Sequence, residues 1–146
     1  MEIKNVFDTE RGAAAVAAVV LTAAVSALSL SLIITIKQEQ NSTRHYAEET
    51  RVTLAAEEGM SEFVGWVERG NLPKGRFLNN GEEMSYSDKK EDGIRKRIYL
   101  KADSSGITVY SFAEGKDKTN KLNIYRQTRV YMNKTDTGYA FKHRLP

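Results

Sequence analysis

The sequence predicts an α+β protein in which one long N-terminal helix, residues 13–69, packs on a four-stranded antiparallel sheet. The first observation is an uncharged run, 13–36, that passes without a proline or glycine into an amphipathic segment. The second is a change of pattern after residue 94, where apolar residues recur with a period of two between clusters of turn residues. Together they predict a helix followed by a sheet.

The uncharged run 13–36 is long enough to cross a membrane. At 1.5 Å per residue, about 24 residues cover roughly 36 Å, and the hydrocarbon core is about 30 Å thick. A secretory signal peptide has a shorter apolar region, of about 7–15 residues, and Val25-Ser26-Ala27 offers a cleavage site for one. Because the apolar run continues to Ile36, the pattern favours an uncleaved span. An exported soluble domain behind a cleaved signal peptide remains an alternative.

Small residues recur four apart in this run, and in lipid such spacing lets helix backbones approach closely. We therefore expect this half of the helix to pack against other helices in a filament or membrane. The residues concerned are Ala13, Ala14, Ala17, Ala18, Ala23 and Ala27.

The amphipathic half of the helix, residues 37–70, carries an apolar stripe opposite a row of acids. The stripe predicts packing on the sheet, and Gly70 followed by Pro73 predicts the helix end. The stripe residues are Val52, Ala56, Met60, Phe63, Val64 and Val67.

Residues 71–94 are polar and rich in turn residues, and we expect a connecting loop there. The four strands are predicted at 95–102, 107–113, 122–132 and 138–144, and their short connections favour a meander. The sheet region 95–146 would form the globular part together with 50–70. The expected core face is Ile98, Leu100, Ile107, Val109, Leu122, Ile124, Val130 and Phe141.

Composition narrows the classes of function. The net charge of +3 is too small to favour a nucleic-acid partner. Without cysteine there is neither a disulfide framework nor a thiolate metal site, and His45 and His143 are isolated, so no metal or cofactor is expected. The segment 103–106 contains two serines but reads as a turn, and nothing supplies a base. The sequence therefore offers no catalytic residues, and we do not expect an enzyme.

A basic cluster is the remaining candidate for a binding surface. It could contact phosphates or a neighbouring subunit, but acids interleave it, so a solvated loop and strand edge is the favoured interpretation. Its members are Lys89, Lys90, Arg95, Lys96 and Arg97.

The N-terminal region, roughly residues 8–68, resembles type IV pilin-like proteins, especially PilX-type minor pilins and related pseudopilins. The resemblance rests on Glu10-Arg11-Gly12 before the apolar helix and on its continuation through 41–47 to 54–59. It implies that residues 1–12 are a leader, that a membrane aspartyl prepilin peptidase cuts after Gly12, and that the new amine of Ala13 is methylated. It also implies a subunit held in the cytoplasmic membrane until an assembly platform moves it into a filament of other pilin subunits.

The chain departs from the family pattern in three features. Major pilins carry a glutamate at the fifth mature position, where this chain has Ala17, and this departure indicates a minor subunit. Ala13 stands where these families often have Phe, and there is no C-terminal cysteine pair.

Lys4 and Arg11 before the span balance Lys37 and Arg44 after it, so charge alone does not set the orientation. From the short N-terminal tail and the resemblance, we expect the N-terminus in the cytoplasm and the C-terminal part outside, in an extracellular filament after assembly. A bitopic membrane scaffold that pairs with a partner through residues 37–69 is the alternative. The sequence does not distinguish adhesion, secretion or DNA uptake as the task of the filament.

Overall fold

A computed structural model of the chain describes residues 3–118 and 121–146, so the first two residues of the predicted leader lie outside the described part. The α+β class is confirmed, with five strands in place of four. The elements are α1 (Ile3–Glu68), the 3-10 turn η1 (Pro73–Gly75), β1 (Glu83–Glu91), β2 (Ile94–Ala102), β3 (Gly106–Lys116), β4 (Asn123–Lys134) and β5 (Tyr139–Leu145).

The chain forms two compact units, Met1–Thr43 and Arg44–Pro146. The first is helical, and α1 begins at Ile3, ahead of the predicted start at residue 13. The second holds the rest of α1 and the whole sheet. Helix α1 ends at Glu68 as predicted, because Gly70 takes φ +86 and its N–H bonds the carbonyl of Val67 at 2.9 Å.

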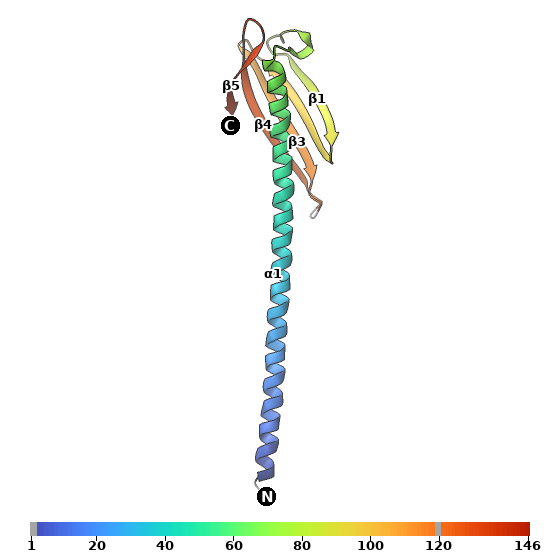
Figure 1. Cartoon of the computed structure of the whole chain (residues 1–146), viewed down its shortest axis with the longest axis vertical. Coiled ribbons are helices and arrows are strands. Elements are labelled where there is room, and N and C mark those ends of the chain that lie inside the picture. The colour runs from blue at the N-terminus through green and yellow to red at the C-terminus, as the bar shows by residue number, and fades with distance from the viewer. Residues whose placement is uncertain (1–2, 119–120) are drawn as a thin grey trace. The chain divides into compact units, whose positions relative to one another are not determined.

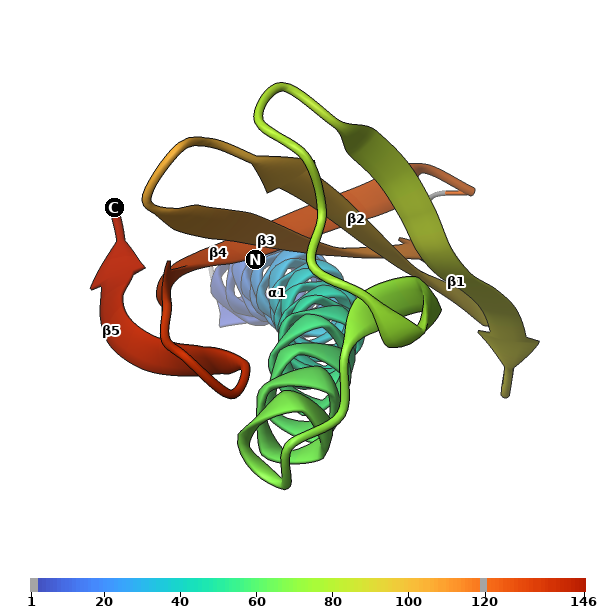
Figure 2. The same ribbon diagram turned by 90° about the horizontal axis from the view of Figure 1, so that it is seen from above.

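The sheet is an antiparallel meander with the order β1-β2-β3-β4-β5, so β1 and β5 are its edges (Figure 1). The part of α1 that belongs to this unit lies across one face of the sheet (Figure 2). The sequence-adjacent pairing confirms the predicted meander, which short hairpin connections favour.

Strand β1 corrects the predicted loop 71–94. All its residues are exposed or half-buried, and a bulge between Ser85 and Ser87 interrupts the alternation, so no period of two is visible in the sequence. It pairs with β2 through a tight turn in which Asp92 (φ 49) and Gly93 (φ 79) both have positive φ. Asp-Gly is the sequence signal for such a turn, and it would have revealed β1.

Two predicted turns are shorter than expected. Strand β3 continues through Gly115 to Lys116, beyond the predicted strand end at residue 113, and β4 continues through Asn133 to Lys134, beyond the predicted end at residue 132. A glycine and a run of polar residues indicated turns there, but ladder pairing of Glu114 with Tyr125 and of Asn133 with Ala140 extends the strands.

The core lies between α1 and the facing sheet surface. Leu100, Ile107, Val109 and Met132 are fully buried, and Met60, Phe63 and Val67 of the predicted helix stripe belong to the same cluster, with Val64 partly buried against it. The other stripe residues, Val52 and Ala56, are buried in a second cluster with Ile94, Ala113 and Ile124. Two predicted core residues are wrong: Leu122 is 59% exposed and Phe141 47%. Leu122 precedes β4 in the turn, and Phe141 lies on the edge strand β5, so neither is covered.

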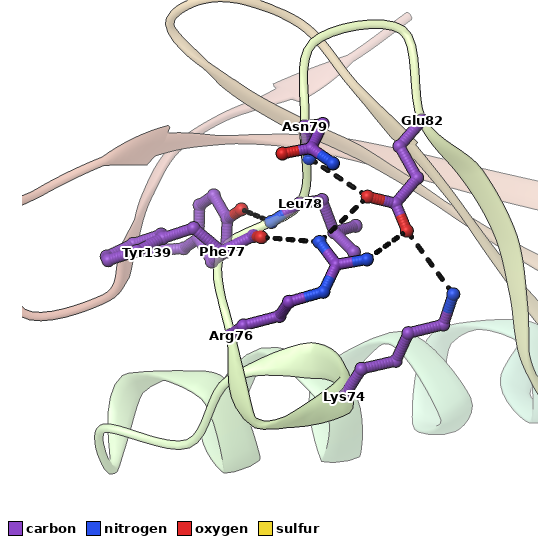
Figure 3. A network of polar contacts seen from close by, with 7 residues as sticks. All are labelled: Lys74, Arg76, Phe77, Leu78, Asn79, Glu82 and Tyr139. Carbon is purple, nitrogen blue, oxygen red and sulfur yellow. Dashed lines mark hydrogen bonds and ion pairs between the residues drawn. The ribbon is translucent and has the colours of Figure 1, made fainter.

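The segment between α1 and β1 is held by a polar network (Figure 3). The Glu82 carboxylate accepts hydrogen bonds from the Arg76 guanidinium at 2.9 and 3.0 Å and from the Asn79 N–H at 3.0 Å, and Lys74 lies at 3.3 Å. The buried Tyr139 hydroxyl accepts the Leu78 N–H at 2.9 Å. The Glu82 contacts fold the segment on itself, and the Tyr139 contact attaches it to β5.

Candidate membrane and assembly surfaces

The apolar segment of α1 has exposed side chains throughout. It belongs to the one helix in the described part of the chain that is long and apolar enough to cross a membrane. None of the apolar segment is buried. The exposed fraction of its large apolar side chains ranges from 51% at Ile36 to 69% at Val19. Such a continuous apolar surface is costly in water, so it needs lipid or another protein around it.

The hydroxyl groups of this segment are satisfied within the helix. Thr22, Ser26 and Ser29 each donate to the carbonyl four residues earlier at 2.8 Å, and Thr35 does so at 3.0 Å. Hydrogen-bonded in this way, they do not oppose placement in hydrocarbon, where an unpaired polar group costs several kcal/mol.

The six alanines predicted to pack do not form one stripe. At about 100° per residue, Ala13, Ala17 and Ala27 share one face, whereas Ala23 lies on one side of it and Ala14 and Ala18 on the other. Together they cover roughly 220° of the helix circumference. A segment of this kind can meet more than one neighbouring helix.

Gly12 and Ala13, the predicted cleavage site, lie inside α1, and nothing comes within 4 Å of a Cβ built on Gly12. A peptidase that needs an extended backbone would have to unwind this turn first. Glycine weakens a helix by about 1 kcal/mol relative to alanine, so the helical turn at Gly12 is easier to unwind than a turn made of alanines.

An open groove of ≈ 980 Å³ runs between α1 and the β1–β2 hairpin. Tyr46 and Leu54 line it from the helix with 67% and 59% of their surfaces exposed, and Ile94 lines it from β2. On the rim, Lys96 lies 2.7 Å from the Glu58 carboxylate. The second unit therefore also exposes apolar side chains along its helix.

The predicted basic cluster is divided between the two faces of the sheet. Lys89 pairs in register with Lys96, whose contact with Glu58 places both on the α1 side, and Lys90 pairs with Arg95 on the other face. Arg95 binds Asp88 at 2.6 Å, and Arg97 lies 3.9 Å from Glu114. The five residues form no single basic surface, and acids neutralise three of them.

Three of the four tyrosines on β2, β3 and β4 lie half-buried on the outer face of the sheet, namely Tyr99, Tyr110 and Tyr131. The rings of Tyr99 and Tyr110 are 6.1 Å apart and those of Tyr110 and Phe112 are 6.2 Å apart, whereas Tyr125 is 57% exposed. The Tyr99–Tyr110 contact joins β2 to β3, and ring contacts between neighbouring strands stabilise a sheet.

His45 is not isolated, contrary to the sequence interpretation. Its Nδ1 lies 2.8 Å from Oδ2 of Asp117, a carboxylate that is fully buried at the β3–β4 turn. The two residues are 72 positions apart, so no local pattern could have paired them. The contact fixes this hairpin to α1.

The fold thus defines an α+β protein with an exposed apolar helix segment. No family model, curated protein or solved structure matches the chain.

Proposed function

We propose that this chain is a minor structural subunit, a minor pilin or pseudopilin, of a type IV pilus-like or type II secretion-like filament. A prepilin peptidase would process it after Gly12, and it would assemble through its N-terminal helix. One observation carries the proposal: an uncharged helical segment whose side chains are exposed throughout continues, in the same helix, into a stripe that packs on a small sheet.

The alanine distribution supports assembly through this segment. Small residues around roughly 220° of the helix suit a crowded helix bundle better than a lone span, because each neighbour needs its own close-contact face. Ala17 leaves the segment without an acid that could pair with a neighbour's N-terminal amine. We therefore place the chain among rarely incorporated subunits.

Before assembly, the subunit would lie in the cytoplasmic membrane as a single-pass protein with its N-terminus inside and Arg44–Pro146 outside. Its partners would be other pilin subunits, the peptidase and the inner-membrane assembly platform. In the filament, the groove with Tyr46 and Leu54 would offer contact surface outside the lipid-buried part.

A bitopic scaffold is the second candidate, because the same groove could receive a partner's helix without any cleavage. The mass of the N-terminal peptide, from protein purified with and without a functional prepilin peptidase, separates the two. The proposal expects methylated Ala13 as the first residue, dependent on the peptidase. An intact Met1 terminus would favour the scaffold, and a terminus near Leu28 would indicate an exported domain.

Gly12→Leu provides a variant for the same measurement, and Gly138→Leu a matched control, since nothing lies within 4 Å of a Cβ at either position. We expect the Gly12 variant to keep its leader and the Gly138 variant to be processed normally. Equal processing of both would contradict cleavage after Gly12.

A further inference from the structure

Three lysines gather at the β3–β4 turn. Lys116 ends β3, and Lys118 and Lys121 follow it; all three side chains are exposed. In the described part of the chain, no acid lies within ion-pair distance of their ammonium groups. They differ in this from Arg95, Lys96 and Lys101, each of which contacts a carboxylate.

The neighbouring turn adds to this basic end of the sheet. The register pairs Arg95 with Glu114, so the β1–β2 turn lies beside the β3–β4 turn, and Gly93 and Lys116 line the same hollows. Lys90 and Arg51 lie there too. Of the acids that line these hollows, Asp117 is fully buried against His45, whereas Glu48, Asp92 and Glu114 remain as partial counter-charges.

The end that carries both turns is the end where α1 enters the globular unit. The His45–Asp117 contact, at 2.8 Å, ties the β3–β4 turn to the second residue of that unit, and the Asp117 N–H bonds the Leu122 carbonyl at 2.8 Å to close the turn. The lysines are thereby held close to the chain at His45.

His45 lies only nine positions beyond Ile36, the last residue of the apolar run. Even fully extended, nine residues reach no more than about 30 Å. When the apolar run is in a bilayer, the lysines can therefore reach the lipid headgroups. Ammonium groups within a Debye length of an anionic leaflet are attracted to it.

We propose that the Lys116, Lys118 and Lys121 end of the sheet binds the headgroups of anionic phospholipids in the leaflet that the apolar helix enters. This contact would hold the globular unit against the membrane until the subunit leaves it. The inference rests on the membrane-inserted form in the proposed function, but on neither cleavage nor filament assembly.

The test uses the full chain reconstituted in bilayer nanodiscs. Because the chain has no cysteine, Asn123→Cys places a single dye beside Lys116, its register partner. Energy transfer to a headgroup-labelled lipid is compared between neutral phosphatidylcholine discs and discs with phosphatidylglycerol. We expect stronger transfer in the anionic discs, and loss of the difference when the salt concentration shortens the Debye length below about 5 Å.

The triple variant Lys116→Gln, Lys118→Gln, Lys121→Gln is expected to lose the effect. Each lysine near an anionic surface changes the contact equilibrium by about fivefold, so three change it on the order of a hundredfold. The matched control is Lys101→Gln, Lys134→Gln, Lys142→Gln, which removes the same charge from exposed sites on β2, β4 and β5 and should keep the lipid dependence.

Energy transfer that is the same in neutral and anionic discs, or that falls equally in both triple variants, would overturn the proposed lipid contact alone. Resistance of the protein to alkaline extraction is measured in parallel. If the full chain fails to insert at all, the proposed membrane-anchored function fails together with this inference, so the two failures are distinguishable.

Discussion

A Cβ atom on Gly115 would lie 2.5 Å from Cγ2 of Val52, the residue at which α1 passes over strand β3. Val52 is 1% exposed and belongs to a buried cluster with Ala55, Ala56 and Ile94. Gly115, a residue type typical of turns, is therefore a contact site where the Val52 side chain of the helix packs directly against the backbone of the strand. Close approach of this kind is one of the few reasons for glycine inside a strand.

Gly115→Ala should destabilise the globular unit by about 1–3 kcal/mol, because the new methyl group cannot fit without moving Val52 or the strand. Gly138→Ala is the control, since nothing lies within 4 Å of a Cβ there. Urea unfolding of the full chain in detergent, followed by the fluorescence of Trp66, measures both. Equal stability of the two variants would show that α1 shifts to accept the methyl group.

Ser111 is fully buried on β3, and its Oγ has no hydrogen-bond partner among the described residues. A buried hydroxyl without a partner costs about 1–3 kcal/mol, so Ser111→Ala should raise the free energy of unfolding by about 1 kcal/mol after loss of some packing. The exposed turn residue Ser105→Ala should stay within about 0.5 kcal/mol of the parent. A loss of stability in Ser111→Ala would reveal an internal water or partner that satisfies the hydroxyl.

Gly59 and Ser111 should be energetically coupled. A Cβ on Gly59 would lie 3.1 Å from Ser111 Oγ, so Gly59→Ala combines a crowded contact with a helix-propensity gain of about 1 kcal/mol. In the Ser111→Ala background the Oγ atom that crowds the new methyl group is absent, so Gly59→Ala should show the full helix-propensity gain. A double-mutant cycle measures the coupling, expected at about 0.5 kcal/mol or more. Strict additivity would place the two residues out of contact.

The sequence predicted correctly those helix and strand segments in which the spacing of apolar residues reflects burial of one face. The stripe through Val52 and Val67 predicted the packed half of α1, and the alternation around Leu100 and Val109 predicted the central strands, because both elements bury one face only. Edge elements lack that signal. Phe141 was predicted on the core face of the last strand, but β5 has a neighbour on one side only and leaves Phe141 47% exposed.

The candidate surfaces divide in the same way. The apolar run and its alanines are local features, so their position in one exposed helix followed from the sequence. The basic cluster is a local run as well, but the pleat sends Lys89 and Lys90 to opposite faces, and carboxylates such as Glu58 arrive from α1. The contact between His45 and Asp117 depends on the tertiary fold, which no local spacing encodes.

Glu82 should make stability depend on pH in the acid range. Hydrogen bonds from Arg76 and then from the Asn79 N–H lower the pKa of the Glu82 carboxyl to about 2 from its ordinary value of 4.5. A lowered folded-state pKa contributes stability above pH 4.5 that is lost as the pH falls towards 2.

We therefore expect Glu82→Gln to have a lower Tm than the parent at pH 6 and the same Tm near pH 2. Glu68→Gln, exposed at the end of α1, serves as the control and should follow the parent throughout. A constant difference between Glu82→Gln and the parent across this range would mean that the network in Figure 3 does not depend on the charge of Glu82.

A charge in the middle of the apolar segment tests whether lipid surrounds it. Leu28→Arg should oppose insertion by about 2.5–3.5 kcal/mol, because an arginine near the bilayer centre must leave water without a partner. Leu54→Arg is a matched control: Leu28 and Leu54 are 66% and 59% exposed on the same helix, but Leu54 lies outside the uncharged run. The readout is the fraction of protein that resists alkaline extraction from membranes. We expect a marked loss for Leu28→Arg and none for Leu54→Arg, whereas equal retention of both would mean that the exposed apolar surface is covered by protein and not by lipid.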